Sequence, residues 1–247
     1  MSRFTDAVAA ELVKVRTVRG LVVGAVLATL ALPLTSLLVV TSGGLGEQDT
    51  LTSGAATGTV VGLLAFGAWG ASVAGSEYVH RTITVSLAAV PHRPTLLLAK
   101  LAAAGAIAAV GGAAAALLSV LLVHSAAPPH THHLGNPWSL VGIVLAFVAV
   151  TVVGVAVGVL VRSSTASIAV VAAAVLLPKA AAGLLGGLQP WVVGASPGTV
   201  VTQLVHGGQL ADDQTFPGGT ALALLSMLAV ATAVGSVSAL AFGRRDG

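Results

Sequence analysis

The stretch SEYVHRTITVSLAAVPHRPTLLLAK, residues 76–100, is polar and basic and lies between two long apolar runs. Its charged side chains include Glu77, Arg81 and Lys100, and two prolines stand close together in it. Proline removes a backbone donor and breaks the interior of a helix, so we expect an irregular backbone here. If the flanking runs cross a membrane, this stretch is the one sizeable loop on the basic side.

The composition of the chain identifies its class. Of 247 residues, 56% are hydrophobic and 8% are charged, whereas about 25% of a soluble globular domain is charged. Apolar runs of 18 residues or more recur along the chain, and such runs are typical of transmembrane helices. The sequence therefore predicts an all-α, polytopic membrane protein embedded in a lipid bilayer.

Six apolar runs predict six transmembrane helices in a single domain that covers residues 1–247. The predicted spans are at about residues 20–41, 54–76, 96–123, 138–161, 166–187 and 218–242.

Residues 2–19 form the longest charged stretch and predict a helix that lies along the cytoplasmic interface. On helical spacing, four apolar side chains share one face and four charged ones lie off it. The apolar set is Phe4, Val8, Leu12 and Val15, and the charged set is Arg3, Asp6, Glu11 and Lys14. The alternative is a helical tail that only leads into the first span.

The charged residues outside the spans separate by sign. With both termini inside, one side receives the bases and the other side receives only acids in its loops, which by the positive-inside rule predicts cytoplasmic termini. The bases are Arg3, Lys14, Arg16, Arg19, Arg81, Arg93, Lys100, Arg162, Arg244 and Arg245, and the acids are Glu47, Asp49, Asp212 and Asp213. Because the formal net charge of +3 is explained by this membrane face, we expect no nucleic-acid partner.

Lys179 is the remaining base, about 20 Å along the fifth predicted span. It could be a counter-charge for a substrate. A lysine stem at that depth can also extend to the outer interface, and this second interpretation is favoured.

Glycines recur at steps of four in two of the predicted spans, where small residues let helices approach closely in lipid. They are Gly54, Gly58 and Gly62 in the second span, and Gly154 and Gly158 in the fourth. The alternative is that glycine is simply frequent in membrane helices.

Three histidines within four residues, His130, His132 and His133, could hold a metal such as Zn²⁺. They lie in a proline-rich segment without carboxylate support, which favours ordinary loop residues. The absence of cysteine excludes thiolate metal sites and cysteine nucleophiles.

The motifs of common enzymes are also absent. The chain has no G-x-x-x-x-G-K-[ST] phosphate loop, no H-E-x-x-H zinc motif and no G-x-S-x-G nucleophile elbow. We therefore expect neither catalysis nor a cofactor in this chain.

Carriers driven by ion gradients usually keep ionisable residues deep in the bundle. With Lys100 counted among the loop bases, only Lys179 lies within a span, which disfavours such a carrier.

Several segments, in order along the chain, resemble the membrane permease subunit of type-2 ABC transporters, a family of bacterial exporters. They are AELVKVRTVRG (10–20), the pairs Glu77-Tyr78 and Thr82-Ile83, AAVPHRPTLLLAK (88–100), VGVLVRSSTASIAV (157–170), Leu177-Pro178 and QPWVVGASPGTVVTQL (189–204). One residue departs from the pattern, since Arg81 stands where the family often has glycine.

The resemblance implies an exporter subunit in the bacterial plasma membrane that pairs with a second permease copy or a related permease. It also implies a separate ATPase subunit that binds ATP and Mg²⁺ and receives a short coupling helix between spans two and three. The residues implied for this contact are Glu77, Tyr78, Arg81, Thr82, Ile83 and Arg93.

On helical spacing, Val79, Ile83 and Leu87 share a face and Pro91 would end the helix. The run 82–85 also alternates as a strand would. The bases of this stretch could instead serve only as membrane anchors. Two other classes of function stay open: a gradient-driven secondary transporter, and a membrane anchor or immunity protein that transports nothing.

Overall fold

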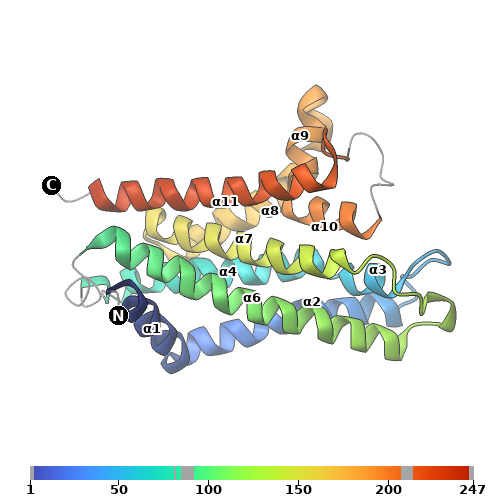
Figure 1. The fold of residues 1–247 in the computed structure, drawn as a ribbon, viewed down its shortest axis with the longest axis horizontal. Helices are drawn as coiled ribbons and strands as arrows, with labels where there is room; N and C mark the ends of the chain where they lie inside the picture. The colour runs from blue at the N-terminus through green and yellow to red at the C-terminus, as the bar shows by residue number, and fades with distance from the viewer. Residues whose placement is uncertain (1–2, 81, 85–91, 207–213, 245–247) are drawn as a thin grey trace.

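The structure, a computed structural model, describes residues 3–80, 82–84, 92–206 and 214–244. Within these ranges the chain is helical and contains no β-strand, which confirms the predicted all-α class. The long helices lie side by side in one elongated bundle (Figure 1).

The bundle consists of long helices, short helices and single 3-10 turns. In chain order they are α1 (Arg3–Thr17), α2 (Arg19–Thr41), α3 (Leu51–Ala56), α4 (Thr59–Val79), α6 (Arg93–Ala126), η1 (Pro129–Thr131), α7 (Trp138–Val161), α8 (Ser164–Ala180), η2 (Ala182–Leu184), η3 (Gly186–Leu188), α9 (Gln189–Gly194), α10 (Pro197–Val205) and α11 (Gly219–Arg244).

In the described ranges, five helical segments are long and apolar enough to cross a membrane. They are Arg19–Thr41, Leu51–Val79, Arg93–Ala126, Trp138–Val161 and Gly219–Gly243. Segments of this length and hydropathy indicate a multi-pass membrane protein.

The remaining predicted span, at 166–187, is shorter than predicted. Helix α8 has 17 residues and is therefore about 26 Å long, below the roughly 30 Å of a hydrocarbon core. After Ala180 the chain continues in the turns η2 and η3, where Gly186 has a φ of +50° that favours glycine. The six-span frame stays a prediction.

The predicted second span is divided into α3 and α4 at Thr57 and Gly58. Helix α2 approaches this break so closely that a Cβ on Gly58 would lie 2.5 Å from the carbonyl oxygen of Leu32. Ser36 bridges the break, because its hydroxyl donates to the carbonyl of Ala55 at 2.9 Å and accepts from the backbone N–H of Gly58 at 3.1 Å.

Helices α4 and α7 cross at the centre of the bundle, and most of their residues are buried. The crossing is close because glycines face backbone across it: a Cβ on Gly154 would lie 2.5 Å from the oxygen of Gly67. Beside it, the rings of Phe66 and Phe147 stack with centroids 4.6 Å apart. Displacement of α4 must therefore also displace the core.

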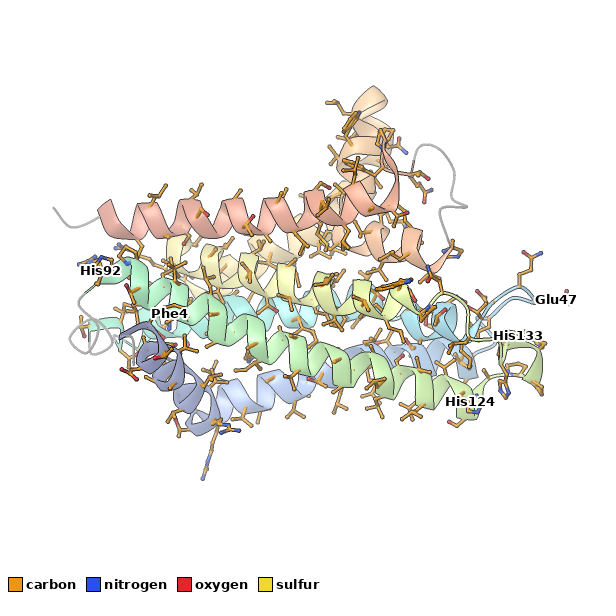
Figure 2. The ribbon with its side chains drawn as sticks, in the orientation of Figure 1. Phe4, Glu47, His92, His124 and His133 are labelled. Atoms are coloured by element: carbon orange, nitrogen blue, oxygen red, sulfur yellow. The ribbon has the colours of Figure 1, made fainter. Side chains whose placement is uncertain are left out.

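The charged residues separate between the two ends of the bundle. Helix α1, the last turn of α4, the first turn of α6 and the end of α11 lie at one end, which we call the basic end (Figure 1). Phe4 and His92 lie there, and Glu47 and His133 lie at the opposite end (Figure 2). The bundle thus separates the predicted cytoplasmic bases from the acidic loop at 42–50.

Helix α1 forms as predicted, but it packs on the bundle through a different face. Ala7, Glu11 and Val15 are buried, whereas Phe4 is 39% exposed. The expectation that Glu11 lies off the packed face is wrong, because this carboxylate finds a buried lysine on α6. Helix α1 ends at Thr17, and the extended residue Val18 forms an elbow to α2.

The predicted loop at 77–100 is shorter in the structure. Helix α4 extends to Val79 and α6 already begins at Arg93, where Pro94 is well placed in the first helical turn. The connection between these helices is therefore residues 80–92. Val79 ends α4, Thr82 lies in a turn, and Ile83 and Thr84 are helical. Arg81 and the remainder of the predicted coupling helix, residues 85–91, lie outside the described residues.

Candidate functional site

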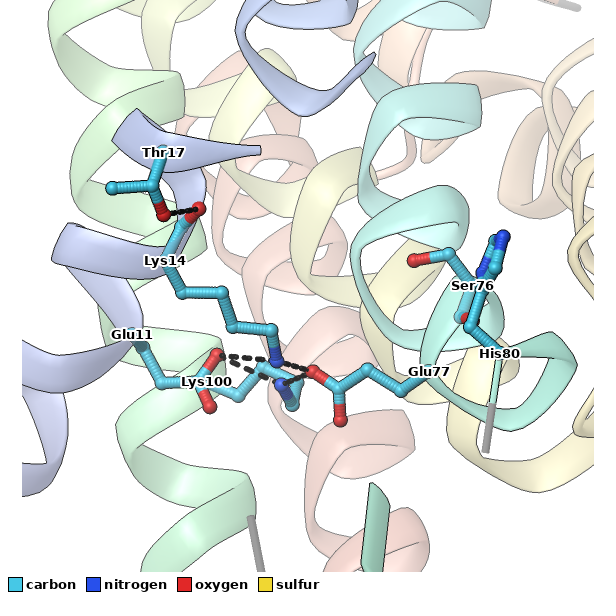
Figure 3. Close-up of polar contacts among 7 residues, drawn as sticks. All are labelled: Glu11, Lys14, Thr17, Ser76, Glu77, His80 and Lys100. Atoms are coloured by element: carbon cyan, nitrogen blue, oxygen red, sulfur yellow. Dashed lines mark hydrogen bonds and ion pairs between the residues drawn. The ribbon is translucent and has the colours of Figure 1, made fainter. Parts of the chain in front are cut away.

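Four charged side chains meet at the basic end, beside the connection at 80–92 (Figure 3). We call Glu11, Lys14, Glu77 and Lys100 the charge cluster. Glu11 and Lys14 come from α1, Glu77 from the last turn of α4, and Lys100 from the second turn of α6. Three helices that are distant in the sequence are thereby joined at one point.

The lysines alternate with the carboxylates. The Lys100 ammonium donates to Oε2 of Glu11 at 2.8 Å and also to Oε1 of Glu77. The Lys14 ammonium donates to the same Oε1 of Glu77 and lies 3.7 Å from Oε2 of Glu11. Two positive and two negative charges balance, so the charge cluster is neutral as a unit.

Three of these side chains are almost inaccessible. The exposed fraction is 2% for the Glu77 side chain, 3% for Lys100 and 6% for Glu11, while Lys14 keeps 25%. Removing one partner from a buried ion pair typically costs about 3–5 kcal/mol, because an uncompensated charge stays buried. Loss of Glu11, Glu77 or Lys100 alone should therefore weaken the link between the three helices.

The second oxygen of Glu77, Oε2, has no hydrogen-bond partner among the described residues. A cavity of about 10 Å³ lies beside it, lined in part by Lys100, Ile83 and Phe242. This volume is at the lower limit for a single water molecule. A cavity of this size leaves no room for a substrate beside Glu77.

Lys14 sits at the rim of the charge cluster. Its burial, followed by the neighbouring Lys100 ammonium, lowers the pKa of Lys14 to about 8, and Glu11 offsets only part of this lowering. As the pH rises through about 8, Lys14 loses its proton and removes one positive charge from the charge cluster.

The charge cluster lies near one end of the bundle rather than at its middle. Helix α6 has 34 residues and is about 51 Å long, which exceeds a roughly 30 Å hydrocarbon core by about 10 Å at each end. Lys100 is seven residues after Arg93, about 10 Å along the helix. If α6 is centred in the membrane, Lys100 lies at the boundary of the hydrocarbon core.

Two cation–π contacts join the remaining helices at this end. The guanidinium of Arg162 lies over the ring of Tyr78 at 5.6 Å, and that of Arg93 lies over Phe242 at 5.7 Å. Arg162 caps α7 in the left-handed conformation, with a φ of +58°. These contacts link α4 to α7 and α6 to α11, so most of the bundle is fastened around the connection.

The structure brings most of the predicted coupling residues to the basic end. Glu77 and Tyr78 lie in the last turn of α4 and point into the bundle. Ile83 packs on the core, and Arg93 is the first residue of α6. The backbone N–H of Thr82 donates to the Glu77 carbonyl at 2.9 Å.

Sequence reasoning missed Glu11, Lys14 and Lys100 as members of a buried site. The expectation that the spans hold no ionisable residue besides Lys179 is wrong, because Lys100 is buried within α6. One available signal was the position of Lys100 inside an apolar run. A second was a glutamate and a lysine three residues apart on α1.

All five predicted packing glycines are buried against other helices of the same chain. For example, a Cβ on Gly62 would lie 2.4 Å from the ring of Phe147, and one on Gly158 would lie 2.9 Å from the oxygen of Ala71. Gly54 faces Val123 in the same way. These glycines therefore offer no surface to a second copy of the chain.

The histidines predicted as metal ligands lie in the segment at the end opposite the charge cluster. The ring centroids of His124 and His132 are 4.5 Å apart, and His130 and His133 are close to His132 in the sequence. Across the described ranges, no group of three or more His, Cys, Asp or Glu side chains is placed to hold a metal ion. Lys179 is exposed in the last turn of α8.

A scan against models of known protein families finds none that matches this chain. A search of curated proteins finds no match either. The assignment of function therefore rests on the fold, the charge cluster and the resemblance described above.

Proposed function

We propose that this chain is the membrane permease subunit of an ATP-driven exporter in a bacterial plasma membrane, with six spans and cytoplasmic termini. A separate ATPase subunit, which binds ATP and Mg²⁺, docks on the connection at 80–92. The observation that carries the proposal is the contact of Glu77 with Lys100, which joins the two helices that flank this connection inside the bundle.

This contact provides a path for force. A partner that displaces residues 80–92 moves the end of α4 and the start of α6 together, because Glu77 and Lys100 hold them to each other. Glu11 and Lys14 extend the same link to α1. Helix α4 also forms the closely packed crossing with α7, and packed cores switch between discrete arrangements rather than bend continuously.

The surface beside the connection suits a protein partner. Val79 is 61% exposed, and His80 and Thr82 are exposed beside it. The His80 ring nitrogen Nδ1 is held 2.8 Å from the Ser76 carbonyl oxygen (Figure 3). Val79, His80 and Thr82 are therefore accessible to a partner that approaches the connection from solution.

A second permease copy is part of the proposal, and α8 with the turns after it is our candidate for its interface. The chain leaves regular helix at η2 and η3, where Leu184 is 90% exposed and Leu188 is also exposed. Irregular backbone is not tolerated against lipid in the hydrocarbon region unless protein or a water-filled cavity covers it. A second copy would provide this cover.

A gradient-driven carrier is the second candidate, and one observation favours it. Carriers use buried ionisable groups, and Glu11, Glu77 and Lys100 are such groups. Their position near the end of α6, away from the middle of the bundle where carriers bind substrate and ions, favours a mechanical role instead.

One experiment separates the two candidates. The tagged chain is purified from its native membranes in mild detergent, and co-purifying proteins are identified by mass spectrometry and assayed for ATP hydrolysis. The proposal expects a stoichiometric partner with a Walker A motif. A carrier would purify without such a partner and, in proteoliposomes, would dissipate an imposed proton or sodium gradient.

A further inference from the structure

A groove of about 610 Å³ opens between α1, α2 and α6, beneath the elbow that joins α1 to α2. Five residues of α2 line it at the spacing of one helical face. They are Val22, Ala25, Val26, Thr29 and Leu30. The only hydroxyl among them, on Thr29, is already bonded to the Ala25 carbonyl at 2.9 Å.

The other walls are apolar as well. Helix α1 contributes Leu12 and Val15, and α6 contributes Ile107 and Val110. Arg16 is the only charged residue among those that line the groove. The groove therefore offers a hydrocarbon-like channel with one cation beside it.

The positive charge at the elbow is not neutralised by the described part of the chain. Arg16 and Arg19 are exposed and form no ion pair with any described residue. The nearby carboxylates of Glu11 and Glu77 are occupied by Lys14 and Lys100. An anion from outside the chain would complete this end of the groove.

The depth of the groove matches the two parts of a phospholipid. Arg19 begins an apolar helix of 23 residues, about 34 Å long, so it marks the boundary of a roughly 30 Å hydrocarbon core. Arg16 then lies at headgroup depth. The lining residues from Val22 to Leu30 extend about 12 Å inward, most of one leaflet.

We propose that this groove binds one anionic phospholipid, with its phosphate at Arg16 and an acyl chain along α2. Clusters of basic residues at the cytoplasmic side of membrane helices recognise anionic headgroups in this way. A second copy of the chain is the alternative occupant, and the test below distinguishes it from a lipid. The site does not depend on whether the protein is driven by ATP.

The test is native mass spectrometry of delipidated protein after addition of dioleoyl phosphatidylglycerol or dioleoyl phosphatidylcholine. We expect one phosphatidylglycerol to be retained about fivefold or more over phosphatidylcholine, which corresponds to about 1 kcal/mol for one basic residue. Arg16→Gln should abolish this preference. Ala106→Phe, at an exposed groove-lining position of α6, should remove the retained lipid.

Matched variants serve as controls. Ala102→Phe changes an exposed residue of α6 that does not line the groove and should retain the lipid, as should Arg244→Gln at the end of α11. Val26→Trp fills the groove from the α2 wall, should the Ala106 variant not fold. Equal retention of both lipids, retention that survives groove filling, or a lipid-free dimer that Ala106→Phe dissociates would each overturn the proposal.

Discussion

Glu77 and Lys100 are 23 residues apart in the chain, and the Lys100 ammonium donates a hydrogen bond to Oε1 of Glu77 inside the bundle. Lys14 of α1 donates to the same oxygen. The two helices that flank the connection at 80–92 are therefore held together at one point, the carboxylate of Glu77. In a protein whose other contacts between helices are mostly apolar, this point is where motion of the connection would enter the fold.

Loss of Lys100 should destabilise the bundle. In Lys100→Met, two buried carboxylates share the single ammonium of Lys14, and we expect the free energy of unfolding to fall by about 3–5 kcal/mol. The double variant Glu77→Leu, Lys100→Met removes one charge of each sign and should recover most of this loss. Thermal unfolding in detergent measures both, and a double variant as unstable as the single one would contradict the charge balance.

Stability should rise with pH above about 8. The Lys14 pKa is about 8 in the folded protein and about 10.4 when unfolded. Below pH 8 both states hold the proton and the burial penalty is fully present. Between pH 8 and 10.4 the unfolded state holds more protons, so the free energy of unfolding increases by up to about 3 kcal/mol.

The contribution of Lys14 to this pH dependence is the difference between the parent and Lys14→Met, because the variant lacks this ammonium and keeps all other titrating residues. When both proteins are unfolded chemically from pH 7 to 10.5, the free energy of unfolding of the parent should increase relative to that of the variant. A parent that loses stability relative to Lys14→Met over this range would show that the carboxylates raise the Lys14 pKa instead.

Adding a single methyl group at the crossing of α4 and α7, as in Gly154→Ala, should destabilise the protein. A Cβ on Gly154 would lie 2.5 Å from the backbone oxygen of Gly67, and overpacking of this kind costs about 1–3 kcal/mol. Gly183→Ala is the matched control, because a Cβ there meets nothing within 4 Å. Thermal unfolding should separate the two alanine variants, and equal melting temperatures would contradict the close crossing.

The orientation of the chain can be tested directly, because the chain has no cysteine. A membrane-impermeant thiol reagent added to intact cells should label Gln48→Cys and His133→Cys, at one end of the bundle. It should label His80→Cys only after the cells are opened. Labelling of His80→Cys in intact cells would reverse the predicted orientation.

Composition and periodicity predict the helical fold and the separation of charge between its two ends, because these depend on transfer of side chains between water and lipid. They do not predict that Lys100 is buried, since that position follows from a carboxylate on α1, 89 residues away. Apolar content also suggested a longer helix after Ser164. Helix α8 instead ends at Ala180, and the left-handed conformation of Gly186 in the turns that follow is a backbone property that hydropathy does not record.

The most direct test of the account is a crosslink between His80→Cys and a nucleotide-binding partner in native membranes. A short thiol-to-amine crosslinker should give one adduct that contains a Walker A protein, with a yield that changes when ATP is added. Gln48→Cys, at the opposite end of the bundle, should give no such adduct. An ATPase adduct from both positions, or from neither, would contradict the proposal that the connection at 80–92 couples this chain to an ATPase.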